Sequence, residues 1–150
     1  RLHHQHDPFA ARYAWHVAHP VDLDRLRALL PRLVGTHDFA GFQSAGAQPR
    51  ENTVRTLHAA RLEAGALVGP QACDGLWRLE FEGDGFLYHM VRNLAGTLIE
   101  IARGRFAPHF LDDALTSGGP FLGHCAPPQG LLLVEVFYPA GRVPAHHAAH

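Results

Sequence analysis

Arg92 is the first candidate for chemistry because it interrupts an otherwise ordinary amphipathic stretch, GDGFLYHMVRNLAGTLIEIARG, at residues 83–104. At about 100° per residue, an apolar arc of about 120° collects Phe86, Met90, Leu94, Leu98 and Ile101. Arg92 lies roughly opposite that arc, so it is either solvated surface or a bidentate donor that holds a partner's charge. One turn later, Gly96 costs about 1 kcal/mol against alanine in a helix, which favours the close approach of a second backbone.

Two further candidates lie in predicted strands. The segment ARYAWHVAH, residues 11–19, alternates in the period-two pattern of a strand, and on that pattern alone Tyr13 is a core or cross-strand aromatic residue. The apolar run LLLVEVFYP, residues 131–139, predicts a central strand. Leu131 at its start is either core or the wall of a pocket.

The other reactive side chains favour structural interpretations. Asp38 lies near a turn and could serve as a nucleophile, but the capping of a short helical turn is favoured. Cys73 and Cys125 are far apart and lack a C-x-x-C companion, so they predict inert thiols in a reducing cytoplasm. The histidines near the two ends could in principle chelate a transition metal: His3, His4, His6, His146, His147 and His150. They lack a cysteine or carboxylate framework, so we predict no metal site.

The composition is that of one globular domain with a sizeable core, at 150 residues, 47% hydrophobic and 18% charged. All 13 of its lysine-or-arginine positions are arginine and the net charge is −1, so nucleic-acid binding would need a local patch or a second domain. No window approaches the ~18 apolar residues of a membrane span and no leader pattern starts the chain, so we expect a cytoplasmic protein. Because the sequence begins RLHHQHDPF without methionine, we expect a piece of a longer protein.

The expected elements alternate in type along the chain. In order they are a strand at 11–19, a helix at 22–34, a short helical turn near 38–42, strands at 53–63 and 76–83, helices at 84–104 and 108–116, and a strand at 131–139. Asp22 and Asp84 are expected to cap the first two helices, and Pro31 to kink the first.

This βαββαβ order predicts an α+β fold, an antiparallel sheet with helices on one face, of the ferredoxin-like or RNA-recognition-like type. Residues 1–10 are expected to be a loose lead-in, 11–139 the folded domain, and 140–150 a disordered tail.

Four segments, in this order, resemble the TruA-type tRNA pseudouridine synthases. ARYAWHV (11–17) is similar to the family's basic-aromatic strand, with tryptophan in place of the second aromatic residue. LVGTHDFAGFQSAG (33–46) with TVRTL (53–57) is similar to the segment after the first helix. GDGFLYHMVRNLAGTL resembles the signature helix, and CAPPQGLLLVEVFY (125–138) resembles the closing strand. The last two are the more specific motifs.

The resemblance implies one half of a two-domain synthase, in which two similar α+β domains enclose a cleft and the protein acts as a homodimer. Such enzymes isomerise uridine in the tRNA anticodon stem-loop, without metal or organic cofactor. Their nucleophile is the aspartate of an R-T-D-x-G-V-H-A motif in the N-terminal domain, which has no counterpart here. The chain is therefore expected to be the C-terminal half, inactive without the N-terminal catalytic domain of the same protein.

The resemblance also assigns roles by position. Arg92 matches the arginine that pairs with the catalytic aspartate, Tyr13 the tyrosine that contacts the target base, and Leu131 the apolar residue that lines the base pocket. Flipping a base out of its stack costs a few kcal/mol, which an aromatic and apolar pocket offsets. The alternative is a non-catalytic RNA-binding or assembly module that retains the fold without the nucleophile. The upstream reading frame discriminates the two.

Overall fold

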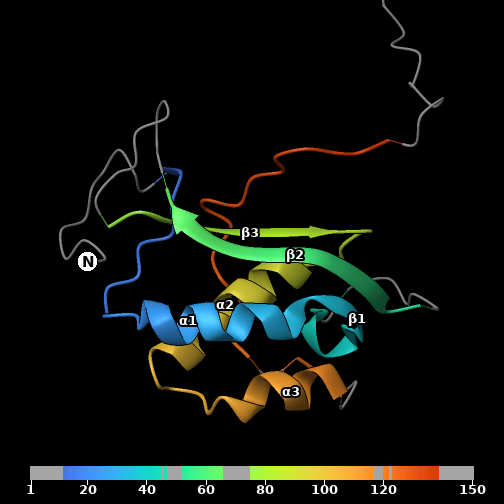
Figure 1. Ribbon diagram of the computed structural model, residues 1–150, viewed down its shortest axis with the longest axis horizontal. Coiled ribbons are helices and arrows are strands. Elements are labelled where there is room, and N and C mark those ends of the chain that lie inside the picture. Colours follow the sequence, from blue (N-terminus) through green and yellow to red (C-terminus); the bar gives the residue numbers. More distant parts are fainter. Residues whose placement is uncertain are drawn as a thin grey trace, which may run out of the picture.

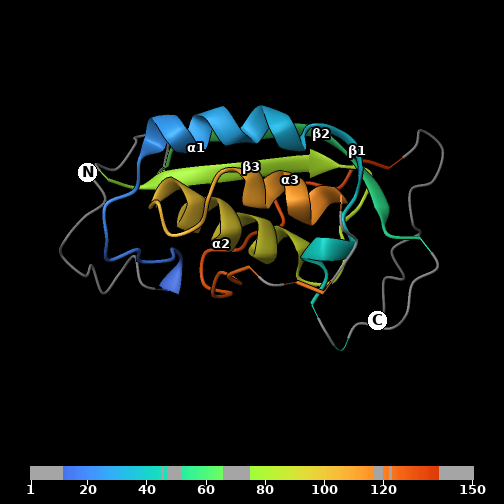
Figure 2. The same cartoon turned by 90° about the horizontal axis from the view of Figure 1, so that it is seen from below.

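A three-stranded antiparallel sheet with its helices on one side forms the fold (Figures 1 and 2). The computed structural model describes residues 12–44, 46, 52–65, 75–116, 120–121 and 123–138. Its elements are α1 (Leu23–Leu29), the 3₁₀ turn η2 (Leu30–Leu33), β1 (Gly35–Asp38), the 3₁₀ turn η3 (Ala40–Phe42), β2 (Val54–Ala64), β3 (Trp77–Gly83), α2 (Met90–Ala102) and α3 (His109–Thr116). The predicted α+β class, with an antiparallel sheet covered by helices on one face, is confirmed.

The register between β2 and β3 separates the two faces of the sheet. Pairs such as Leu62 with Leu79 join apolar side chains, whereas the alternating pair Glu63 with Arg78 joins charged ones. Arg78 also contacts Glu80, at 2.7 Å between Nε and Oε1. The predicted strands at 53–63 and 76–83 are confirmed to within one residue, because their alternation is that of a sheet with one covered face.

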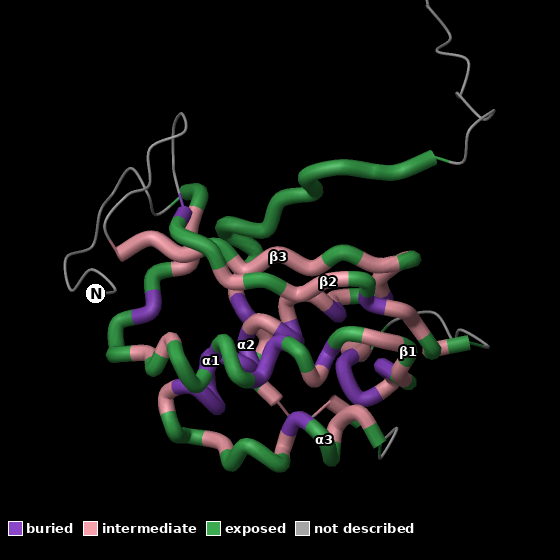
Figure 3. The backbone as a smooth tube through the Cα atoms, in the orientation of Figure 1, coloured by how far each residue is buried: buried purple, intermediate pink, exposed green. Residues whose placement is uncertain are grey.

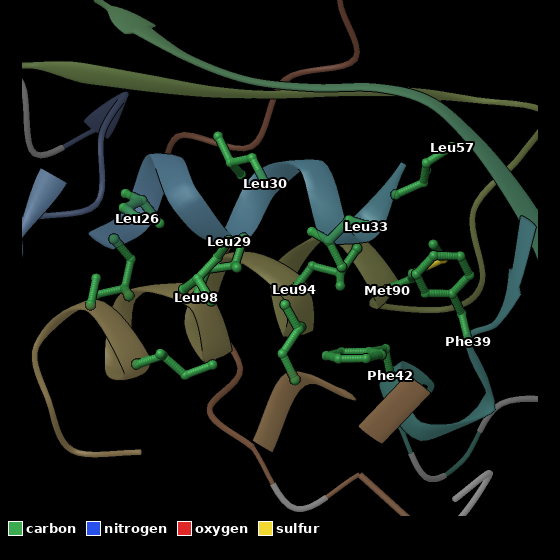
Figure 4. Packing of buried hydrophobic residues seen from close by; sticks show 14 of the residues in the cluster. Leu26, Leu29, Leu30, Leu33, Phe39, Phe42, Leu57, Met90, Leu94 and Leu98 are labelled. Atoms are coloured by element: carbon green, nitrogen blue, oxygen red, sulfur yellow. The ribbon is translucent and has the colours of Figure 1, made fainter. Parts of the chain in front are cut away.

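The core lies between the sheet and the helices, where side chains of α1 and α2 meet (Figure 4). Four of the residues predicted on the apolar arc of α2 are fully buried: Met90, Leu94, Leu98 and Ile101. Asn93 is also fully buried, and its Nδ2 donates to the Phe42 carbonyl at 2.7 Å. Together these contacts fix the rotation of α2 about its axis, which leaves Arg92 on the opposite, half-buried side.

Three local predictions are confirmed by hydrogen bonds and helix bounds. The carboxylate of Asp22 accepts from the backbone N–H groups of Asp24 and Arg25 and so caps α1. The α-helix ends at Leu29 and continues as a 3₁₀ turn containing Pro31, which cannot donate to the preceding turn. Asp38 holds the short turn η3, because its Oδ1 accepts from the Ala40 N–H at 3.0 Å.

The start of α2 differs from the prediction. Asp84 does not cap the helix, which begins six residues later at Met90 with His89 in the capping position. The Asp84 carboxylate instead accepts from the Thr56 N–H at 3.0 Å, and its own N–H donates to the Thr56 carbonyl. Asp84 therefore serves the sheet, and the amphipathic pattern upstream of Met90 belongs to a connecting segment.

The predicted first and last strands are wrong within the described residues. Residues 12–20 and 131–138 carry no strand, while the short β1, in a segment expected to be turns, pairs with β2 instead. Alternation indicates which faces of a segment are apolar, but a strand also needs a hydrogen-bonded neighbour. The run 131–138 rises away from the sheet on the side opposite the helices and is exposed along its length (Figure 3).

Several expectations fall outside the described residues. These are the lead-in at 1–10, the tail at 140–150 with both histidine clusters, and Cys73. Among the helices in the described ranges, none is both long and apolar enough to cross a bilayer.

Candidate functional site

A cavity of about 350 Å³ brings Tyr13, Arg92 and Leu131 together in its lining. The three residues come from separate parts of the chain: the segment before α1, the polar side of α2, and the start of the exposed run. Most of the remaining wall is apolar and is contributed by the other elements, among them Val17, Leu23, Leu26, Leu62, Leu79 and Phe81. A wall of this kind suits a largely apolar group that is oriented by a few polar atoms.

Arg92 is held at two of its nitrogens. Its Nε donates to the Ala126 carbonyl at 2.7 Å, and its Nη1 lies 3.1 Å from Nε2 of His89. The backbone bond runs in the other direction too, because the Ala126 N–H donates to the Arg92 carbonyl at 3.0 Å. A guanidinium carries five N–H donors. Those left on Nη1 and Nη2 have no hydrogen-bond partner in the part of the chain that the structure describes.

These remaining donors have the chemistry that binds a carboxylate. Two parallel N–H groups on one planar group match the two oxygens of a carboxylate in a bidentate pair. The bonds to Ala126 and His89 fix the plane in advance, so little side-chain entropy remains to be lost when an anion arrives. Arg92 is therefore not simply solvated surface.

Gly96 explains how the segment 124–126 can lie so close to α2. A Cβ on Gly96 would sit 1.9 Å from the His124 carbonyl oxygen and 2.8 Å from the Ala126 nitrogen. The expected close approach of a second backbone is thus confirmed, and the backbone belongs to this same chain. His124 is further placed by its ring, which stacks on Trp15 with centroids 5.8 Å apart.

Tyr13 and Leu131 line the cavity from two segments that lie close together. Both are well exposed, at 65% and 49%, so neither is a core residue. Gly130 joins their segments, because a Cβ there would lie 3.0 Å from both the Tyr13 carbonyl oxygen and the Ala14 Cα. Gly130 also has a φ of 86°, which other residues rarely adopt.

Two contributors to the site escape sequence reasoning. The Ala126 carbonyl is a backbone group, so no residue type in the sequence predicts its role. His89 precedes Arg92 by three residues, a spacing that places two side chains together on a helix, yet its ring position depends on a left-handed backbone with φ 59°. The i,i+3 spacing was the one available signal.

A second arginine cluster lies at the other end of α2, away from the cavity. Glu100 is 3% exposed, and its Oε1 accepts from Arg103 Nη1 at 2.7 Å. Its Oε2 lies 3.2 Å from Arg105 Nε. These arginines have a carboxylate from their own chain, which Arg92 lacks among the described residues.

No metal centre competes with this assignment in the described ranges, where no three histidine, cysteine, aspartate or glutamate side chains gather to hold an ion. Cys125 is a free thiol of intermediate burial beside the cavity wall. Besides Arg92 and Tyr13, the polar side chains of the cavity lining include Arg78 and Gln129, and Arg78 is paired with Glu63 and Glu80.

A comparison with known families matches residues 30–139 to the family described as tRNA pseudouridine synthase. The chain belongs to this family. Proteins of the family named tRNA pseudouridine synthase A are similar to it over most of its length. The protein of Latilactobacillus sakei is 39% identical over 91% of this chain, and the match covers 53% of that protein. The protein of Listeria monocytogenes is 36% identical over 88% of this chain, and the match covers 51% of that protein.

A protein named tRNA pseudouridine synthase A 1, from Protochlamydia amoebophila, is 38% identical over 88% of this chain and 50% of its own length. The chain thus spans about half the length of the curated relatives it matches. In this member of the family, the two most specific motifs of the sequence supply Arg92 and the start of the exposed run.

Proposed function

We propose that this chain forms one side of the active-site cleft of a tRNA pseudouridine synthase that acts on uridine in the anticodon stem-loop. The observation that carries the proposal is the shared cavity. Tyr13, Arg92 and Leu131, the three residues that the sequence singles out, line one pocket of a size that suits a nucleobase.

In this proposal Arg92 holds the nucleophilic aspartate, which the N-terminal half of the protein supplies. The reaction breaks the bond between N1 and C1′ of the uridine and forms a bond between C5 and C1′. The C5 proton leaves and N1 gains one, so no atoms are lost overall. A guanidinium beside the aspartate favours its ionised form and fixes its direction in a site from which water is excluded.

Tyr13 and Leu131 are proposed to receive the base. The phenol ring can stack on a flipped uracil, with its hydroxyl near C5, where a proton must be removed. Leu131 supports the opposite side with apolar contact. Because both side chains line the cavity and are exposed, they are available to a base that arrives from outside the domain.

The same proposal also names the binding partners of the chain. The tRNA anticodon stem-loop is the substrate, the N-terminal catalytic domain completes the cleft, and the whole protein works as a cytoplasmic homodimer without metal or cofactor. The 150-residue chain alone is inactive, because it lacks the nucleophile motif. A run of exposed apolar residues at 131–138 would promote self-association of the isolated chain.

The test uses the full-length protein encoded by the reading frame that contains this chain, acting on tRNA whose uridines carry tritium at C5. Arg92→Lys keeps the positive charge but loses the planar guanidinium that can bind a carboxylate through two N–H groups. It should lower the single-turnover rate of tritium release on the order of 100-fold, with tRNA affinity unchanged. Arg105→Lys, at the other end of the same helix, is the matched control and should retain the full rate.

Two results would overturn the proposal. One is an unchanged rate for Arg92→Lys in a folded protein that binds tRNA. The other is tritium release by the 150-residue chain alone. A full-length protein that binds tRNA but releases no tritium would instead support the non-catalytic RNA-binding module.

A further inference from the structure

We propose that His89 is a positioning residue that orients Arg92 for its carboxylate partner, by accepting a hydrogen bond from Nη1 through Nε2 of a neutral ring. The inference rests on the proposed function of Arg92. It assigns a role to a residue that neither the apolar arc of α2 nor the three cavity residues include.

The chemistry of the contact fixes the tautomer of His89. Nε2 of the ring and Nη1 of Arg92 are 3.1 Å apart. A guanidinium carries only donors and stays protonated, so the ring nitrogen must be the acceptor. The ring proton is then on Nδ1, and His89 is neutral in this arrangement.

The backbone at His89 is unusual in a way that serves this contact. His89 is the one non-glycine residue with positive φ in the described part of the chain, at 59°. Such a backbone is unfavourable for a residue with a Cβ, so it persists where its surroundings hold it. The side chain makes no capping bond to the helix that starts at the next residue, so its ring is free to turn toward Arg92.

A second ring holds the imidazole in place. Tyr88 stacks on His89 with centroids 3.8 Å apart and an interplanar angle of 23°. The Tyr88 carbonyl in turn accepts from the Ser44 N–H at 3.4 Å, next to η3. The guanidinium is therefore braced from both sides, by a stacked imidazole at Nη1 and by the Ala126 carbonyl at Nε. These two contacts therefore fix the orientation of the donors that remain on Nη1 and Nη2.

Two substitutions separate the acceptor from the ring. His89→Phe keeps a flat ring that can stack on Tyr88 but has no acceptor. His89→Gln loses the ring but places an acceptor oxygen near the position of Nε2. In the full-length protein, His89→Phe should lower the single-turnover rate about 10-fold to 100-fold, as expected for a lost hydrogen bond to a charged group, with tRNA affinity unchanged. His89→Gln should recover most of that rate.

A spectroscopic measurement on the 150-residue chain tests the contact without any turnover. The ring ¹⁵N shifts of His89 should report the tautomer protonated on Nδ1, and Arg92→Met, which removes the donor, should shift the ring toward protonation on Nε2. A His89 protonated on Nε2 in the unchanged chain would overturn the inference. So would full turnover by His89→Phe beside a defective Arg92→Lys. A fully active Arg92→Lys would instead count against the proposed function, whatever the tautomer.

Discussion

The two ends of α2 hold arginines in opposite electrostatic situations. At the C-terminal end, Arg103 and Arg105 share the nearly buried carboxylate of Glu100, at 2.7 and 3.2 Å. Toward the N-terminal end, Arg92 is held only by neutral acceptors, a backbone carbonyl and an imidazole. The first arrangement contains its own carboxylate, whereas in the described residues Arg92 has none and lines a cavity.

This difference teaches how one helix can serve both stability and function. A carboxylate beside Arg92 would satisfy the guanidinium and close the site, as Glu100 does for its arginines. Neutral acceptors instead position the group without cancelling its charge. Among the described residues, the arginines at the C-terminal end of the helix have a carboxylate partner, and in the proposed function Arg92 receives its partner from the N-terminal half.

The strongest way to disturb the open end is Gly96→Ala. Helix propensity alone would make this change stabilising by about 1 kcal/mol. Because the new Cβ would overlap the His124 carbonyl, we instead expect a loss of about 2 to 3 kcal/mol in the free energy of unfolding. Urea denaturation of the 150-residue chain gives the sign directly. A gain in stability would contradict the close packing of 124–126 on α2.

The closed end should respond in stability alone. Glu100→Gln keeps the shape but removes the charge that Arg103 and Arg105 share, so we expect a loss of about 1 to 2 kcal/mol. Turnover by the folded full-length protein should not change. Glu82→Gln, whose side chain is 45% exposed on the outer sheet face and 3.8 Å from Arg61, is the control and should have almost no effect. Lost turnover in folded Glu100→Gln would show that the two ends are not independent.

The smallest effect is expected at Arg105. Its side chain is 65% exposed, and its contact with Glu100 is one of two that the carboxylate makes. Arg105→Lys should therefore change the free energy of unfolding by less than about 0.5 kcal/mol. Thermal denaturation of Arg105→Lys and Glu100→Gln compares the contributions of the two partners in this cluster. A loss larger than that of Glu100→Gln would mean that Arg105, rather than Arg103, holds the cluster together.

Sequence patterns predicted the middle of this domain better than its ends. Periodicity placed Leu94 and Leu98 inside and Arg92 outside, because a helix buried on one side repeats its environment every turn. The same logic failed for 11–19 and 131–139, since alternation specifies faces but not neighbours. The sequence also misplaced the start of α2, because the Asp84 carboxylate binds the Thr56 N–H instead of capping the helix.

The residues of the candidate site could be predicted from the sequence, whereas their arrangement around one cavity could not. Periodicity isolated Arg92, and resemblance to a family singled out Tyr13 and Leu131. No local pattern could tell that these three line one cavity, because the arrangement depends on Gly130 and Gly96 admitting backbone from distant segments. The i,i+3 spacing places His89 beside Arg92, but no local pattern predicts its left-handed backbone or its contact with the guanidinium.

The paired hydrogen bonds between Arg92 and Ala126 have a consequence for cooperativity. One bond uses the arginine side chain and the other its backbone, so the direction of the guanidinium and the position of residue 126 change together. Four residues later the chain reaches Gly130 and then Leu131, beside Tyr13. In the proposed function, an anion that fixes Arg92 is therefore expected also to order the segment of Leu131 beside Tyr13, so that binding of the N-terminal half and binding of the base become linked equilibria.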